Sequence, residues 1–128
     1  MNESNSERHE STALQDYQSM IDALVAIRSD VCAARVIAKQ PWPNLPENRE
    51  INSFLATLSD KQRETLVVLL QHSRDGGIHD VLAYLTDEIN SRGLRLVRHG
   101  RELPVEPFGT EMYWDWTCRR EGDPWPKL

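Results

Sequence analysis

The chain has 128 residues, a length typical of one domain, and carries a net charge of −5 with 27% charged and 39% hydrophobic residues. This composition is typical of a soluble globular protein, and the acidic balance argues against a general nucleic-acid binder, which needs a basic face. No stretch approaches the ~18 apolar residues of a membrane span, and the polar N-terminus lacks the apolar core of a secretion signal. We therefore expect a cytoplasmic protein that does not associate with membranes.

The two cysteines, Cys32 and Cys118, are far apart and fit no metal-binding spacing such as C-x2-C. In a reducing cytoplasm both remain free thiols that pack as small apolar groups. The sequence contains no P-loop or other cofactor motif, so we expect neither a metal nor a cofactor.

The N-terminal part of the chain predicts a disordered tail at 1–13 and a single helical domain at 14–128. Apolar residues recur at helical spacing from Tyr17 onward and predict a helix over roughly 14–39, which ends before Pro41. The proline-rich segment that follows is a stiff linker around Trp42. That tryptophan either fills a groove in the core, which we favour, or is exposed as a docking residue.

The middle of the chain predicts three more helices. A short helix covers 47–58, and Ser59 with Gln62 fits a capping box that starts the next one. That helix is expected to end near residue 73 because Asp75-Gly76-Gly77 is a typical helix terminator. The continuous apolar run around Val68 indicates that it is buried on more than one side. A fourth helix follows over 78–92 and ends before Gly93.

After Gly93 the apolar pattern changes from helical to alternating. A two-residue turn at His99-Gly100 places Arg98 opposite Arg101, and it aligns the apolar residues of 94–105 on one face. This agreement predicts a β-hairpin. Pro104 lacks an amide proton, so its strand should be an edge.

Residues 110–120 are compatible with two structures. Alternation at period two suggests a strand, whereas the residues at the ends, from Thr110 to Gly122, are typical of a helix, which we favour. The predicted fold is therefore mainly α, a helical bundle of about five helices with one β-hairpin near residues 94–105.

Titratable residues around the Gly-Gly segment are weak candidates for a catalytic site. His79-Asp80 resembles the His-Asp dipeptide of HD-type phosphohydrolases, which bind a metal. Asp75 and Glu111 are further candidates, and together the four residues define an alternative reading as a small metal-dependent hydrolase. The simpler reading is that Asp80 is a first-turn charge that complements a helix dipole. We predict no metal site here.

The segment after Phe108 has the most unusual composition in the chain. Carboxylates among tryptophans can bind a ring by stacking, but they also occur in cores that close a small domain. Tryptophan, tyrosine and arginine are favoured at protein interfaces. The predicted interaction surface therefore comprises Tyr113, Trp114, Asp115, Trp116 and Arg119.

Three segments carry a resemblance to a known family. RDGGIHDVLAYL at 74–85, FGTEMYWDW at 108–116 and RREGDPWP at 119–126 resemble a family of small uncharacterised bacterial proteins. The resemblance implies a bacterial cytoplasmic protein, and it transfers no functional residue because no activity is attached to the family.

These observations favour a non-enzymatic protein-interaction or regulatory protein whose partner is another protein or a second copy of itself. Immunity and antitoxin proteins have this size and charge, by analogy only. A third reading, in which Arg95, Arg98 and Arg101 bind nucleic acid, conflicts with the acidic charge of the chain.

Overall fold

The computed structural model describes residues 11–128, so the disorder predicted for the first ten residues lies outside the described part. The fold is mainly α, as predicted. The described elements are α1 (Ala13–Ala26), α2 (Val31–Ile37), the 3-10 helix η1 (Pro46–Asn48), α3 (Arg49–Ala56), α4 (Asp60–Arg92), β1 (Val97–Arg98), β2 (Arg101–Glu102) and α5 (Met112–Arg120). They divide into two compact units: a central unit of residues 26–81 and a terminal unit that combines residues up to 25 with residues 82–128.

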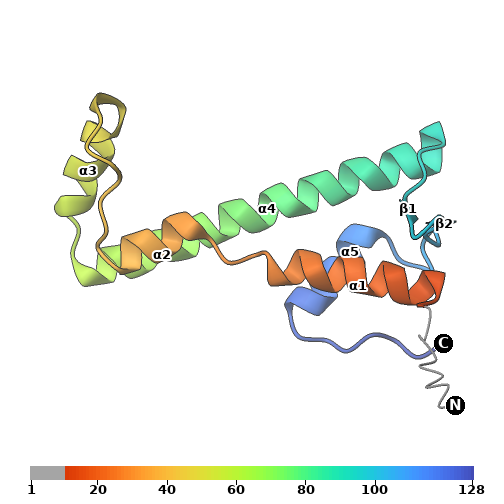
Figure 1. Cartoon of the computed structure of the whole chain (residues 1–128). Coiled ribbons are helices and arrows are strands. Elements are labelled where there is room, and N and C mark those ends of the chain that lie inside the picture. The colour runs from red at the N-terminus through yellow and green to blue at the C-terminus, as the bar shows by residue number, and fades with distance from the viewer. Residues whose placement is uncertain (1–10) are drawn as a thin grey trace, which may run out of the picture. The chain divides into compact units, whose positions relative to one another are not determined.

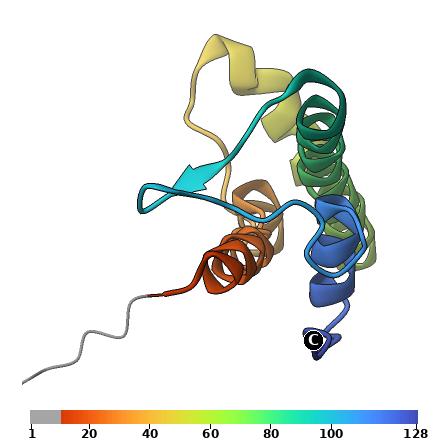
Figure 2. The same ribbon diagram turned by 90° about the vertical axis from the view of Figure 1, so that its right-hand side faces the viewer.

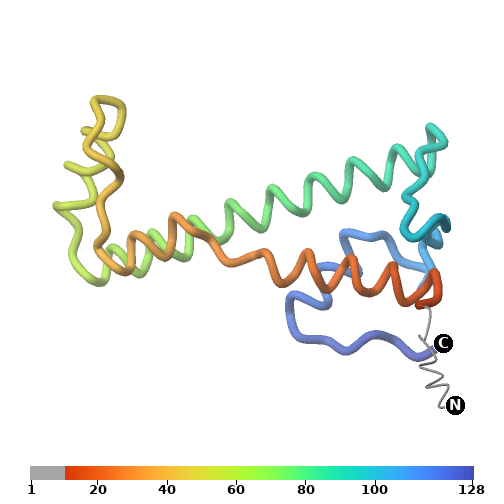
Figure 3. The backbone as a smooth tube through the Cα atoms, viewed as in Figure 1, coloured from red at the N-terminus to blue at the C-terminus, as the bar shows by residue number. Residues whose placement is uncertain are grey.

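The prediction of one helix over 14–39 is wrong, because the chain leaves the helical conformation at residues 27–30 and starts again as α2. Figure 3 shows this break in the orange part of the tube. Its cause is Asp30, whose carboxylate accepts hydrogen bonds from the amides of Cys32 and Ala33 at 2.7 and 3.2 Å. A side chain that satisfies two otherwise unpaired amides is a strong helix start.

The predicted helix break at Asp75-Gly76-Gly77 is also wrong. Helix α4 runs without interruption for 33 residues (Figure 1), and neither glycine has the positive φ that would end it. The ends of α4 are as predicted. Ser59 Oγ accepts from the Gln62 amide at 3.1 Å and Gln62 Oε1 from the Ser59 amide at 2.8 Å, and Gly93 follows the last turn with φ 77°.

Contacts on the inner side of α4 explain why the helix continues through its glycines. Asp75 does not cap a turn, because both of its oxygens bind the guanidinium of Arg28 at 2.8 and 2.9 Å. Gln71 donates to the carbonyl of Arg28, and Arg74 donates to the carbonyl of Ile27. These contacts anchor one turn of α4 to the segment before α2, and they outweigh the low helix propensity of two glycines, which is roughly 1 kcal/mol each.

Polar contacts hold the short elements of the central unit together. The amide side chain of Asn52 on α3 pairs with both backbone groups of Trp42, at 2.9 and 3.0 Å, and Figure 3 shows the extended linker running beside α3. Arg35 lies 5.6 Å from the Trp42 ring, which is half-buried. Residues 47–58 form the predicted short helix as η1 and α3.

The terminal unit packs α1, the end of α4, the hairpin and α5 around Trp116, which is fully buried together with Tyr17 and Ile21. Figure 2 shows the hairpin as a tight turn in cyan. It has the predicted turn and register: Arg98 pairs with Arg101, and His99 and Gly100 both have positive φ. Residues 112–120 are helical, as predicted.

Candidate interaction surface

The outer side of α4 in the central unit presents two adjacent ridges of exposed residues. Side chains four apart on a helix lie one above the other, and such rows are the ridges by which helices pack together. We call this surface the glycine face. Its two ridges are Leu69–Ser73–Gly77–Val81 and Val68–His72–Gly76–Asp80.

The apolar members of the glycine face are exposed. Leu69 is 64% accessible, Val81 58% and Val68 54%. The expectation that the run around Val68 is buried on more than one side is therefore wrong, since only the inner side of α4 is anchored by Asp75. The outer side lacks apolar partners among the described residues.

The two glycines of this face have no local structural reason to be glycine. Both are exposed and helical, and a Cβ built on either one meets no atom within 4 Å. Alanine would fit there and would stabilise the helix by roughly 0.5–1 kcal/mol at each position. Glycine at such a position is expected where another backbone approaches closely. The sequence signal that could have found this face is the i+4 spacing of Ser73 and Gly77 between Leu69 and Val81.

The candidate catalytic residues do not form a metal site. His79 Nδ1 lies 3.6 Å from Asp80 Oδ1 at the surface, with side chains 45% and 86% exposed. Asp75 is engaged by Arg28, and Glu111 belongs to the terminal unit at the N-cap of α5. Within residues 11–128, no three His, Cys, Asp or Glu side chains are grouped so that they could hold a metal ion. Cys32 and Cys118 are free thiols, as predicted, but the expectation that both pack as small apolar groups is wrong for Cys32, which is exposed.

The predicted aromatic surface is divided between core and exterior. Trp116 and Asp115 are buried at 0% and 3%, and Tyr113 and Arg119 are half-buried. Only Trp114 is exposed among the five, at 51%. The guanidinium of Arg119 stacks 4.4 Å from the Trp125 ring, which also stacks on Phe108. Most of this segment therefore closes the terminal unit.

Asp115 is the polar centre of that core. It accepts hydrogen bonds of 2.5 Å from both the Tyr17 hydroxyl and the Thr110 hydroxyl. Burial, together with the neighbouring Asp115, raises the pKa of Tyr17 well above its ordinary value. Thr110 does not cap α5 as expected, because its hydroxyl serves Asp115.

The basic residues of the hairpin contact Asp16 of α1. Arg101 and His99 lie 3.2 and 3.4 Å from the buried carboxylate of Asp16, and Arg98 donates to the Asp16 carbonyl. The hydrogen bond from Ser11, aided by His99 and Arg101, holds the pKa of Asp16 below its usual value against the opposing effect of burial. Arginines that complete an intramolecular cluster are poorly placed for the nucleic-acid reading.

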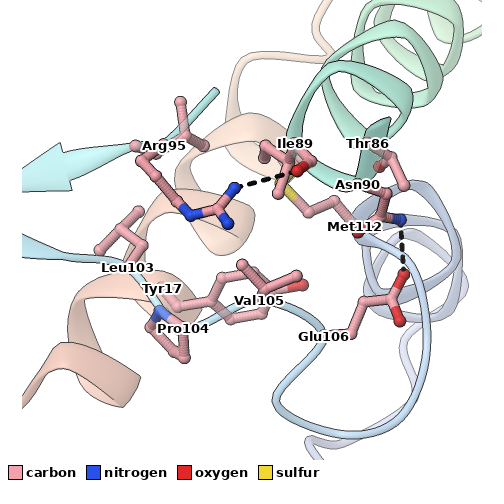
Figure 4. A pocket seen from close by; sticks show the side chains of 11 residues that line it. Tyr17, Thr86, Ile89, Asn90, Arg95, Leu103, Pro104, Val105, Glu106 and Met112 are labelled. Carbon is pink, nitrogen blue, oxygen red and sulfur yellow. Dashed lines mark hydrogen bonds between the residues drawn. The ribbon is translucent and has the colours of Figure 1, made fainter. Parts of the chain in front are cut away.

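A small apolar cleft lies between the end of α4 and the hairpin (Figure 4). Its wall includes Leu103, Met112 and Arg95, whose guanidinium donates to the carbonyl of Ile89, and Asn90 donates to Glu106 across the rim. The cleft encloses only about 20 Å³, the room of about one water molecule. It is therefore a packing gap and not a substrate pocket.

The comparison with known families agrees with the expectation of an uncharacterised family. The model of a family of unknown function, DUF6547, matches residues 10–127. The chain belongs to that family. No curated protein and no solved structure matches it. None of the helices in residues 11–128 combines the length and apolar character needed to cross a bilayer.

Proposed function

We propose that this member of DUF6547 is a non-enzymatic protein-interaction protein, and that it forms a homodimer through the glycine face of α4. The observation that carries the proposal is the pair Gly76-Gly77, which is exposed and helical and has open space above it. A long helix keeps two destabilising glycines on its outer surface when a partner helix must come close.

The pattern of the face indicates a second copy as the partner. Along one ridge the order is apolar, small, small, apolar, from Leu69 through Ser73 and Gly77 to Val81, so it reads the same in both directions. In an antiparallel pairing, Leu69 meets the partner's Val81, and Ser73 meets the partner's Gly77. Such self-complementarity is the requirement of a two-fold interface.

The charges of the second ridge fit an antiparallel pairing in a different register, centred on Gly76 and not between Ser73 and Gly77. His72 and Asp80 lie four residues before and after Gly76, so an antiparallel partner crossing at Gly76 brings His72 to the partner's Asp80. Ridges of this i+4 type interdigitate at a crossing angle of about 50°. Because a two-fold interface has a single centre, the two registers are alternatives: the first pairs the apolar residues of one ridge, and the second pairs a hydrogen-bond donor with a carboxylate.

The crossing involves about three turns of one helix from each copy. The area buried by such a short contact is less than the ~800 Å² per partner of a standard interface. We therefore expect a dimer that dissociates in the micromolar range. Sedimentation velocity or light scattering over that range of concentration should show a reversible monomer–dimer equilibrium. A strict monomer at the highest soluble concentration would contradict the proposal.

The substitution Gly77→Ala distinguishes a glycine that is needed for the fold from a glycine that is needed for the dimer interface. A glycine kept for a structural reason would lower the stability of the chain when replaced, whereas the open space here predicts a more stable helix. The interface predicts that the dimer dissociation constant rises by about tenfold or more, because the added methyl groups hold the two backbones apart. Equal dimerisation by the variant and the wild type would exclude the proposed crossing point.

A matched pair of surface variants gives the control. Leu69→Gln removes an exposed apolar side chain of the glycine face, and Val97→Gln removes one of similar exposure, 62%, from β1 of the terminal unit. Leu69→Gln should weaken the dimer, and Val97→Gln should not. Weakening by both would indicate nonspecific hydrophobic association.

A further inference from the structure

The central unit contains a second feature, independent of the glycine face: a pocket of about 250 Å³ whose charged lining residues are all cations. Arg35 and Lys39 from the end of α2 and Arg63 from α4 contribute to it, and no acidic residue does. The chain as a whole carries a net charge of −5, so this lining is the reverse of the average surface. We propose that the pocket binds a multiply charged oxyanion, namely phosphate or the phosphoryl group of a small molecule.

Arg63 supplies a buried charge on the wall of the pocket. It is only 8% exposed, and its guanidinium donates to the carbonyls of Val36 and Leu55, near the ends of α2 and α3. Its Nε has no hydrogen-bond partner in the described part of the chain. The carboxylate on which its positive charge acts is Asp60, which pairs directly with Lys39. The two carbonyls accept hydrogen bonds from the guanidinium as neutral groups, so they place no formal negative charge beside it. An anion in the adjoining pocket supplies that charge.

Arg35 and Lys39 add two more accessible cations. Arg35 is held beside the pocket by its hydrogen bond to the Pro41 carbonyl, at 3.2 Å, and by the Trp42 ring. Lys39 pairs with Asp60 at 2.9 Å, and its hydrogen bond holds the pKa of Asp60 below the usual value. Both partners of that pair are largely exposed, so it is weak and leaves Lys39 able to turn to an anion.

The backbone at Lys39 shows that lysine is not the residue the fold prefers there. The amides of Lys39 and Gln40 donate to the carbonyls of Val36 and Arg35, which is the Schellman ending of a helix. Lys39 occupies its left-handed position with φ 55°, whereas α5 ends in the same motif with Gly122 at φ 90°. A side chain there costs about 1 kcal/mol relative to glycine, so Lys39 is retained against the backbone preference.

Three cations around one small pocket favour a phosphate over a monocarboxylate, because the ligand charge must balance more than one of them. The pocket is smaller than the ~300–1,000 Å³ of a site for a drug-sized molecule. The recognised group is therefore a single phosphate, either free or as the end of a small ester.

The test is titration of the full chain with inorganic phosphate, glycerol phosphate and acetate at constant ionic strength. Thermal unfolding and amide chemical shifts are followed together. We expect phosphate, glycerol phosphate or both to raise the unfolding temperature and to shift amides around Arg35 and Arg63, since a ligand of the folded state stabilises it. Preference for glycerol phosphate would identify a phosphoryl ester as the ligand, and preference for phosphate the free ion. An equal response to acetate, or none to either phosphate, would overturn the proposal.

Lys39→Gly distinguishes a binding role from a structural one. It relieves the left-handed backbone and should raise the unfolding temperature without ligand, yet it should weaken phosphate binding about tenfold. Lys61→Gln, a basic surface residue of α4 outside the pocket lining, is the control and should bind phosphate like the wild type. If Lys39→Gly binds phosphate as tightly as the wild type, Lys39 is not part of the site. If both variants lose the same affinity, the effect comes from the net charge of the chain and not from the pocket. Association of the chain is a separate readout, so failure here leaves the dimer proposal intact.

Discussion

Arg28 binds Asp75 through two parallel hydrogen bonds, from Nε to Oδ1 at 2.8 Å and from Nη2 to Oδ2 at 2.9 Å. The pair connects the segment between α1 and α2 to the middle of α4, one residue before the two glycines. Its geometry is the bidentate form that gives arginine–carboxylate pairs both strength and a fixed orientation. It therefore decides which side of α4 faces inward and leaves the glycine face outward.

The first prediction concerns this ion pair. Asp75→Asn removes the carboxylate and leaves Arg28 without its charge partner, so we expect the free energy of unfolding to fall by about 1–3 kcal/mol, less than for a fully buried pair because Arg28 is 28% exposed. Urea denaturation followed by circular dichroism measures the change. Asp87→Asn, in the exposed pair with Arg92, is the control and should change stability by less than about 0.5 kcal/mol.

The second prediction concerns Arg63. Arg63→Met keeps much of the buried volume but removes the guanidinium from the carbonyls of Val36 and Leu55, which then keep the backbone amides of Lys39 and Leu58 as donors. We expect a loss of about 1–3 kcal/mol, because two buried hydrogen bonds from a charged donor are lost. Denaturant unfolding of the variant tests this, and Arg49→Met, at an exposed position of α3, serves for comparison. A variant as stable as the wild type would show that the backbone amides of Lys39 and Leu58 are sufficient donors for the two carbonyls.

The third prediction contrasts Gly76, which lies inside α4, with Gly93, which directly follows its last residue. Gly76→Ala should raise the free energy of unfolding by roughly 0.5–1 kcal/mol, because Gly76 is helical and unobstructed. Gly93→Ala should lower it by about 1 kcal/mol, because Gly93 has φ 77°. Both are measured well below the micromolar concentrations at which the proposed dimer is expected to form. Opposite signs for the same substitution would confirm that α4 continues through one glycine and ends at the other.

The fourth prediction concerns alkaline pH. The pKa of Tyr17 is raised in the folded state by burial and by Asp115, so the stability contributed by its neutral hydroxyl is fully present below the unfolded pKa, near 10. Above that pH the unfolded chain releases the Tyr17 proton while the folded chain retains it, and stability falls by about 1.4 kcal/mol per pH unit from this group. Unfolding measured from pH 8 to pH 11 should show this slope.

Tyr17→Phe is the matched variant for that slope. It should lower stability at neutral pH by about 1–3 kcal/mol, because one oxygen of the buried Asp115 carboxylate is left without a donor. Above pH 10 the difference between wild type and variant should shrink. Parallel pH curves for the two proteins would contradict the assignment.

Local patterns were sufficient to predict much of this fold. The capping box at Ser59, the hairpin turn at His99-Gly100 and the helix after Glu111 depend on neighbours within a few residues, and all three are observed. Local patterns wrongly predicted a helix break at Asp75. Its carboxylate binds a guanidinium 47 residues earlier, and that distant contact overrides the low helix propensity of the glycines.

The candidate surfaces were less predictable for the same reason. Tryptophans after Phe108 look alike in the sequence, yet Trp116 is buried and Trp114 is exposed, because only one of them faces the core that Tyr17 helps to form. The cationic pocket depends on Arg63 meeting the ends of two other helices. No spacing rule within one segment can reveal a meeting of three elements.

The connectivity of the two units has a consequence for synthesis of the chain. The central unit is one continuous stretch, residues 26–81, and all of its internal contacts can form as soon as that stretch has left the ribosome. The terminal unit joins Tyr17 to Asp115, 98 residues later. The side chains of α1 that pack in this unit therefore stay uncovered until residue 115 and its neighbours have been made. A chain that ends before residue 115 leaves its first helix without this core, so recognition by chaperones and proteases should begin at α1.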